Sequence, residues 1–181
     1  MTNLTITLDD AQVLAALQRL ARSLADPTPA MQQIGELLLA STKDRFKTST
    51  APDGTPWAAN SALTLSRYLN KTTGNRKKDG TLSKQGQTRL AGKKPLIGES
   101  KTLSTQFAVR AQRDQVMLST NVEYAAVQQF GAKQGAFGRD KRNHPLPWGD
   151  IPARPFLGFS DRDKADILAI LSEYLDNAAK G

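Results

Sequence analysis

A stretch from Ser66 to Pro95, rich in charge and poor in apolar side chains, most constrains the fold. Between Arg67 and Lys94 it holds nine basic residues and one acidic residue, Asp79, a net charge of +8. The whole chain of 181 residues also has a net charge of +8, so the rest of the sequence is balanced. Only four large apolar side chains lie in the stretch, too few to offset the entropy of ordering it. We therefore expect a basic, flexible insertion without regular structure at about residues 66–95.

Two interpretations of this basic stretch stay open. It can be a solvated loop, or an arm that becomes ordered against an acidic partner, either a phosphate backbone or a neighbouring protein. Aromatic residues are nearly absent from it, which argues against base stacking on single strands. The loop expected at residues 131–149 is also basic. The candidates for a DNA-facing or partner-facing surface are Arg76, Lys77, Lys78, Lys84, Arg89, Lys93, Lys94, Arg139, Lys141 and Arg142.

Apolar residues at helical spacing predict helices at both ends of the chain. One helix is expected from Asp9 or Asp10 to about Ala25, and a second from Thr28 to Phe46 or Lys47. Ser160 to Asp163 resembles a capping box and predicts the start of a last helix that runs to near Gly181. A short helix is expected from Glu123 to Phe130, closed by Gly131.

Alternating apolar residues predict a β-hairpin in the middle of the chain. The alternation runs from Leu103 to Val109 and resumes from Val116 to Leu118, after a polar turn. Residues 151–159 contain two prolines and predict an edge strand at best. The turn formers before Trp57 predict a loop that this indole anchors on the core. The fold class expected is α+β: N-terminal helices, a small antiparallel sheet with long loops and a C-terminal helix, in a single domain over residues 1–181.

Composition excludes several classes of protein. The chain has no cysteine, which excludes disulfides, thiolate metal sites and cysteine nucleophiles. Its one histidine, His144, excludes zinc sites that need several histidines. No apolar run approaches the ~20 residues that a membrane span needs, and the N-terminus does not resemble a secretory signal. We therefore expect a soluble protein, made inside the cell, without membrane partners and not a metalloenzyme.

Known catalytic patterns match the sequence poorly. Gly86 to Lys94 has five residues between its glycines and lacks the hydroxyl that a phosphate-binding loop needs after its lysine. His144 is the only candidate base for a serine hydrolase, but it lies in a loop beside prolines, and the sequence has no nucleophile elbow (Gly-x-Ser-x-Gly). Asp53 with Glu99-Ser100-Lys101 resembles the acidic pair and lysine of magnesium-dependent nucleases. A nuclease function therefore stays open as an alternative. We expect no enzyme, and no catalytic, cofactor or metal site.

Three short motifs, in order, resemble the phage virion morphogenesis family of Mu-like and related tailed phages. They are Pro52-Asp53-Gly54-Thr55-Pro56-Trp57, then Tyr124 to Gly131 (Tyr-Ala-Ala-Val-Gln-Gln-Phe-Gly), then Ile151 to Gly158 (Ile-Pro-Ala-Arg-Pro-Phe-Leu-Gly). Lys94-Pro95-Leu96 matches a further family pattern. The order and spacing agree over nearly the whole chain.

The resemblance implies a non-enzymatic virion protein of the neck, made and assembled in the host cytoplasm. It would complete or cap the tail and join it to the head as a ring of six copies. Its partners would be copies of itself, other neck, connector and tail-tube proteins, and packaged DNA by non-specific contact. Within the motifs, the interface candidates are Arg154, Phe156, Tyr124 and Gln129. Arg154 can instead cover the core with its stem, and Phe156 can pack in the core. The alternative function is a DNA-binding or magnesium-dependent nuclease protein that uses the basic segment 67–94.

Overall fold

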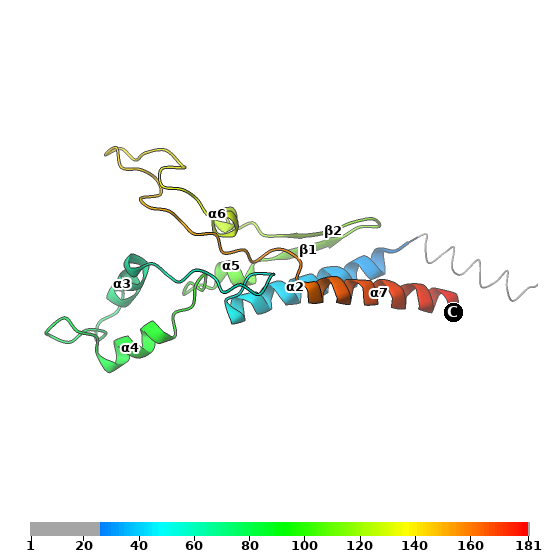
Figure 1. Ribbon diagram of the computed structural model, residues 1–181, viewed down its shortest axis with the longest axis horizontal. Helices are drawn as coiled ribbons and strands as arrows, with labels where there is room; N and C mark the ends of the chain where they lie inside the picture. Colours follow the sequence, from blue (N-terminus) through cyan, green and yellow to red (C-terminus); the bar gives the residue numbers. More distant parts are fainter. Residues whose placement is uncertain (1–25, 181) are drawn as a thin grey trace, which may run out of the picture. The chain divides into compact units, whose positions relative to one another are not determined.

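Residues 26–180 are described by the structure, which is a computed structural model, and they divide into two units (Figure 1). The first unit comprises residues 26–41, 108–119 and 159–180, and the second comprises residues 42–107 and 120–158. The helix expected from Asp9 or Asp10 to Ala25 lies outside the described residues. The single domain over residues 1–181 stays a prediction.

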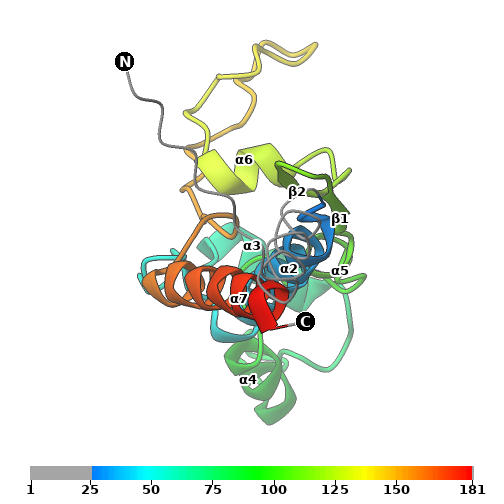
Figure 2. The same ribbon diagram turned by 90° about the vertical axis from the view of Figure 1, so that its right-hand side faces the viewer.

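Two helices and a β-hairpin build the first unit. Helix α2 spans Thr28–Thr48, of which the part up to Ser41 belongs to this unit, and helix α7 spans Asp161–Lys180. Both helices were predicted, and α7 lies near α2 in Figure 1 and in Figure 2. Strands β1 (Ala108–Ala111) and β2 (Val116–Ser119) pair antiparallel, which confirms the hairpin.

Close contacts and caps hold the first unit together. A Cβ at Gly35 would lie only 2.4 Å from Cγ1 of Val109, so glycine allows α2 to approach the hairpin. The predicted capping box of α7 is confirmed: the Ser160 N–H donates to Oδ2 of Asp163 at 2.8 Å, and the Asp163 N–H donates to Oγ of Ser160 at 3.1 Å. The Tyr174 hydroxyl donates to the carbonyl of Asp26 at 2.8 Å and ties α7 to the start of α2.

An aromatic core organises the second unit. The ring of Phe46 lies 5.2 Å from that of Trp57 and 5.4 Å from that of Phe156, measured between centroids. The indole N–H of Trp57 donates to the Pro155 carbonyl at 2.8 Å, so the predicted anchoring of this loop is confirmed. Aromatic pairs at these distances add stability beyond the area that they bury. The other buried members of the core are Ala51, Leu103, Val122 and Ala125.

The strand expected from Leu103 is partly helical, and this prediction is wrong. Helix α5 spans Thr102–Thr105, and β1 begins only at Ala108. The alternating pattern misled because the side chains of Leu103 and Phe107 are buried by the aromatic core rather than by a neighbouring strand. Leu103 is buried in the core of the second unit and Phe107 packs against it, whereas Val109 belongs to the first unit.

The basic stretch contains two helices, so the prediction that it lacks regular structure is wrong. Helix α3 spans Ala62–Asn70 and helix α4 spans Lys84–Ala91, and residues 62–91 form what we call the first arm. Few apolar residues are enough to order the stretch because hydrogen bonds from polar side chains hold the loop between α3 and α4 in place. The buried Asn75 side chain donates to the carbonyls of Leu69 and Thr72, at 2.6 and 3.1 Å. The guanidinium of Arg89 lies 4.6 Å from the centre of the Tyr68 ring. The flexibility of the segment stays a prediction.

Helix α6 leads into a second arm, residues 131–150. α6 spans Ala125–Phe130 and ends at Gly131 (φ 74°), as predicted. The second arm leaves and returns beside Ala132 and Ile151, which form an isolated antiparallel bridge. Ile151 is in no regular strand, as the prolines suggested. The fold is α+β, as predicted, and no helix within residues 26–180 is long and apolar enough to cross a membrane.

Candidate functional site

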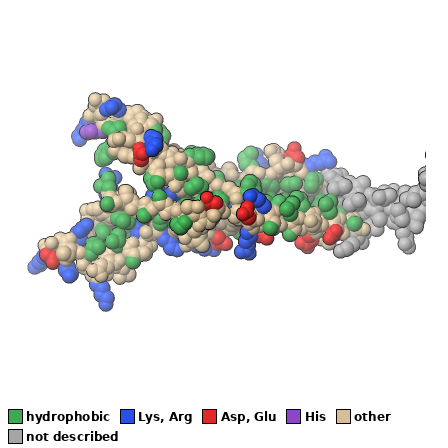
Figure 3. Space-filling view, in the orientation of Figure 1, with side chains coloured by type: hydrophobic (Ala, Val, Ile, Leu, Met, Phe, Trp, Pro, Cys, Tyr) green, Lys and Arg blue, Asp and Glu red, His purple; other side chains and the backbone are tan. Residues whose placement is uncertain are grey.

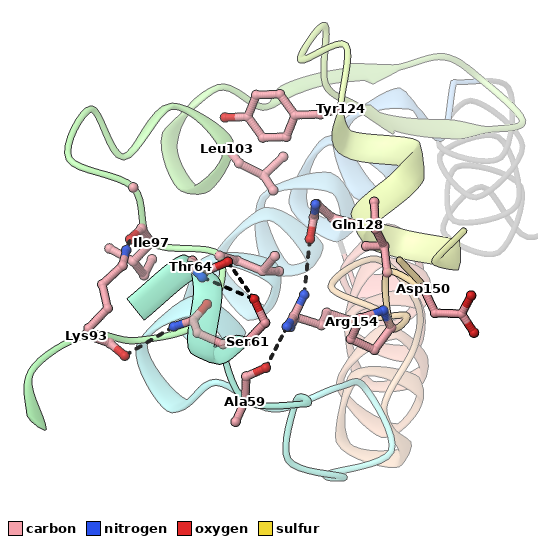
Figure 4. A pocket seen from close by; sticks show the side chains of 15 residues that line it. Ala59, Ser61, Thr64, Lys93, Ile97, Leu103, Tyr124, Gln128, Asp150 and Arg154 are labelled. Carbon is pink, nitrogen blue, oxygen red and sulfur yellow. Dashed lines mark hydrogen bonds between the residues drawn. The ribbon is translucent and has the colours of Figure 1, made fainter. Parts of the chain in front are cut away.

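A cavity of about 460 Å³ opens in the second unit (Figure 4). Four stretches of the chain that are far apart in sequence build its wall: residues 59–64, 93–103, 124–128 and 150–154. Polar side chains face it from each stretch, and aliphatic side chains fill the gaps between them. We call it the Arg154 cavity, after the most buried of its charged residues.

Arg154 is held by the chain's own carbonyl groups. Its Nε donates to the Ala58 carbonyl at 2.7 Å, its Nη2 to the Ala59 carbonyl at 2.8 Å, and its Nη1 to Oε1 of Gln128 at 3.4 Å. The residue is only 8% exposed, and burial lowers the pKa of its guanidinium. Arginine nevertheless stays charged at neutral pH. No carboxylate among residues 26–180 lies within ion-pair distance of it.

The glutamines of α6 fix the chain on either side of Arg154. The Arg154 N–H donates to the Gln128 carbonyl at 2.7 Å. Oε1 of Gln129 accepts from the N–H groups of Phe156 and Leu157, both at 3.0 Å, and its Nε2 donates to the Leu157 carbonyl at 2.9 Å. Gln129 therefore bonds its own chain. Gln129 lies 27 and 28 residues before the backbone groups that it bonds, so no local sequence signal relates them.

The predicted interface residues lie in different surroundings. Phe156 has no exposed surface, so the structure shows the core alternative that the sequence left open. Tyr124 is 49% exposed at the rim of the Arg154 cavity. The interface roles of Tyr124, Gln129 and Arg154 stay predictions.

The wall opposite Arg154 combines Lys93 with the start of α3. The Lys93 ammonium donates to the carbonyl of Ile97 and lies 5.1 Å from the centre of the Tyr68 ring. Burial lowers the pKa of Lys93; the charge of Glu99 acts in the opposite direction, and the charge of Lys71 adds a smaller lowering. Ser61 caps α3 by accepting from the Thr64 N–H at 3.2 Å. Ser61 was not predicted as a site residue, although a serine before an apolar run is a helix-start signal.

Asp150 also lines the cavity, but its carboxylate is engaged elsewhere. Oδ2 pairs with the Lys133 ammonium at 2.8 Å, and Oδ1 accepts from the Gln134 N–H at 2.8 Å. These bonds lower the pKa of Asp150, first through the hydrogen bond with Lys133. In Figure 4 the carboxylate points away from Arg154.

Most of the predicted basic residues lie at the tips of the two arms, where Figure 3 shows Lys and Arg side chains gathered. Arg76 and Arg139 have the same construction: Nη1 of each donates to the carbonyl four residues on, at 2.9 and 2.8 Å. Lys94 donates to the Lys47 carbonyl at 2.6 Å. The structure therefore brings only Lys93 of the basic candidates to the Arg154 cavity. The candidates that are exposed and form neither an ion pair nor a side-chain hydrogen bond among the described residues are Lys77, Lys78, Lys84, Lys141 and Arg142.

Exposed aromatic side chains on and beside the second arm were not predicted. Phe130, Phe137 and Trp148 are 79%, 57% and 60% exposed. The guanidinium of Arg67, from the first arm, lies 5.9 Å from the Trp148 ring. Periodicity could not find Phe137 and Trp148 because they lie in irregular backbone; Phe130 is the last residue of α6. Aromatic residues and arginine are enriched at protein interfaces. Residues 26–180 contain no group of three His, Asp or Glu side chains placed to hold a metal ion.

Comparison with known proteins agrees with the resemblance in the motifs. The chain is 25% identical over 170 residues to the Mu-like prophage FluMu G protein 2 of Haemophilus influenzae (strain ATCC 51907 / DSM 11121 / KW20 / Rd). That alignment covers 93% of this chain and 94% of the relative. No solved structure matches the chain. The model of the phage virion morphogenesis family matches residues 8–176, and the chain therefore belongs to this family.

Proposed function

We propose that this protein is a structural component of the phage neck, which completes or caps the tail and joins it to the head as an oligomeric ring of six copies. The observation that carries the proposal is the family match over residues 8–176. A virion role follows from the family, and the ring and the neck position are the proposal's own additions. The family also supports a structural rather than a catalytic role.

The surface of the second unit suits assembly. Phe130, Phe137 and Trp148 expose large aromatic side chains, and aromatic residues are enriched at protein interfaces. A ring contact is heterologous, so one surface must match a different surface on the next copy. We expect the second arm to supply one of these surfaces.

Electron microscopy of a lysate from a phage that lacks this gene tests the proposal. Heads filled with DNA that lie apart from finished tails are expected, and the wild-type gene supplied in trans should restore joined particles. Joined particles in the deletion lysate would contradict the joining role. A second complementation, with Phe137→Ser and Trp148→Ser combined, should fail if the second arm forms the contact, while the purified variant stays folded.

DNA binding is the second candidate, and the free basic residues at the arm tips favour it. Lys77 and Lys78 at one tip, and Lys141 and Arg142 at the other, are exposed and form no ion pair among the described residues. A surface that neutralises phosphates loses affinity steeply as the salt concentration rises. The logarithm of the association constant falls linearly with the logarithm of the salt concentration, by ~0.9 per phosphate neutralised. No comparable observation favours a nuclease: Asp53 accepts from the Thr55 N–H at 2.9 Å in a turn, and Glu99 pairs with Lys71 at 3.3 Å.

Fluorescence anisotropy with a labelled duplex across a salt series tests this candidate. Lys77→Ala with Lys78→Ala should lower the salt slope by about 2 if both side chains contact phosphate. Arg110→Ala with Arg113→Ala removes the same charge from the exposed hairpin of the first unit and serves as the control. Equal losses in both double variants would show that only net charge matters. Cleavage of the duplex in magnesium that is lost on Glu99→Ala would instead support the nuclease.

A further inference from the structure

The charge of Arg154 has no counter-ion within the described residues, although the side chain is 8% exposed. A buried charge is costly unless it is both paired and hydrogen-bonded. A guanidinium has five N–H groups, and those of Arg154 form three hydrogen bonds, to Ala58, Ala59 and Gln128. All three acceptors are neutral. Two N–H groups and the whole charge therefore remain for a ligand in the cavity.

Other groups of the same cavity also favour an anion. Lys93 contributes a second cation, which is partly buried. Asn60, Ser61 and Thr64 place the N-terminal end of α3 at the wall. The first N–H groups of a helix have no partner within the helix, and this end carries a partial positive charge. Three independent elements thus surround the cavity with positive potential.

The carboxylate that the cavity itself contains does not neutralise this potential. Asp150 is paired with Lys133 and accepts from the Gln134 N–H, and its side chain points away from Arg154 (Figure 4). Glu99 does not line the cavity and pairs with Lys71 at 3.3 Å; its charge also acts on Lys93, but it forms no ion pair with Arg154.

We propose that the Arg154 cavity binds the carboxylate of an Asp or Glu side chain that a segment of a partner virion protein inserts. A carboxylate matches a guanidinium in geometry and forms strong charge-assisted bonds with it. The volume of about 460 Å³ and the aliphatic wall of Leu96, Ile97 and Leu103 suit an amino-acid side chain and its neighbours. The phosphates of a duplex lie on a broad convex surface and do not reach a guanidinium this buried. The inference rests on the proposed function only for the source of the segment.

Position 64 offers a matched pair of variants that leave Arg154 in place. Thr64 lines the cavity, and its N–H and hydroxyl both bond with Oγ of Ser61. Ser61 caps α3 through the backbone N–H of residue 64, which both Glu and Gln retain, so either variant keeps the start of α3. Thr64→Glu brings a carboxylate into the cavity from the chain itself and should occupy the site. Thr64→Gln has nearly the same size without the charge.

Nuclear magnetic resonance of the full chain, labelled with ¹⁵N, tests the inference through the Nε–H signal of Arg154. The probe is the capped tripeptide Ala-Glu-Leu, and capped Ala-Gln-Leu is its neutral control. We expect a saturable shift with the first and binding at least tenfold weaker with the second. Thr64→Glu should abolish the shift and Thr64→Gln should retain it. Equal responses to both peptides, or a stronger shift with a DNA duplex, would overturn the inference. Phage joining is not needed for this readout, so the neck proposal can fail while the carboxylate site stands, and the reverse.

Discussion

Replacement of Gly86 by alanine tests whether the first arm is ordered in the way described. A Cβ at Gly86 would lie 2.1 Å from the carbonyl oxygen of Asn75 and 3.0 Å from the carbonyl carbon. The same oxygen accepts from the Ser83 N–H at 3.0 Å, so the obstacle is backbone that is already bonded. Either α4 or the loop at Asn75 must move by about 1 Å to restore ordinary contact.

The expected loss follows from three contributions. Overpacking of this kind costs about 1–3 kcal/mol, and loss of the Ser83–Asn75 hydrogen bond costs about 1 kcal/mol. The better helix propensity of alanine offsets about 1 kcal/mol. The net loss in local stability is therefore about 1–3 kcal/mol, or about 5- to 150-fold in the equilibrium for opening the arm.

Amide hydrogen exchange on the full chain measures this opening directly. The Gln87 N–H, which donates to the Ser83 carbonyl at 2.9 Å, should exchange faster in Gly86→Ala by that factor. Gly92→Ala is the control, because a Cβ there would lie 3.5 Å from the nearest atom outside its neighbours, the Thr88 carbonyl oxygen. Unchanged or slower exchange in Gly86→Ala would refute the reasoning. That result would match the segment without regular structure that the composition predicts.

Three further predictions concern the second unit. Trp57→Phe keeps an aromatic ring in the core but loses the hydrogen bond to the Pro155 carbonyl, so the free energy of unfolding should fall by about 1 kcal/mol. Calorimetry should show a Tm lower by about 2–4 °C, and an unchanged Tm would contradict this prediction. Gln129→Ala leaves two N–H groups and one carbonyl of residues 156–157 without partners and should cost about 1–3 kcal/mol in urea unfolding, whereas Gln134→Ala, on the exposed second arm, should cost far less. Hydrogen bonds, above all from the His144 N–H, hold the pKa of Asp140 below its ordinary value of 3.8, so its stabilisation of the second-arm tip is present above that value and lost as the pH falls through the lowered pKa. The His144 amide should then exchange faster than its intrinsic rate predicts in acid, and Asp140→Asn should remove this pH dependence.

The sequence predicts the long helices and several turns because their signals are local. Both α2 and α7 carry an apolar face, and α7 also carries its capping box at Ser160. Gly131 and Trp57 each match a recognised local pattern, a helix end and an anchored loop. Such features depend on residues within about one turn of each other.

The first arm and the cavity could not be predicted because they depend on contacts distant in sequence. Composition counts the apolar residues of the arm but not the buried Asn75 side chain, whose three hydrogen bonds replace part of a core. The cavity combines Lys93, Ser61 and Arg154 from three stretches, and no spacing rule relates them. Arg154 was predicted as a site residue from its setting between prolines, but nothing local shows that its charge is left without a counter-ion.

The interleaving of the two units restricts how the chain can be made and cut. The polypeptide passes from one unit to the other after Ser41, Phe107, Ser119 and Gly158. The ribosome therefore cannot deliver a finished first unit while the second is being synthesised, as it does for domains that follow one another. The second unit is complete only when residue 158 has been synthesised. The first unit lacks α7 until Asp161–Lys180 has been synthesised, long after α2. Truncation cannot isolate either unit, so the arms and their cavity have to be studied in the whole protein.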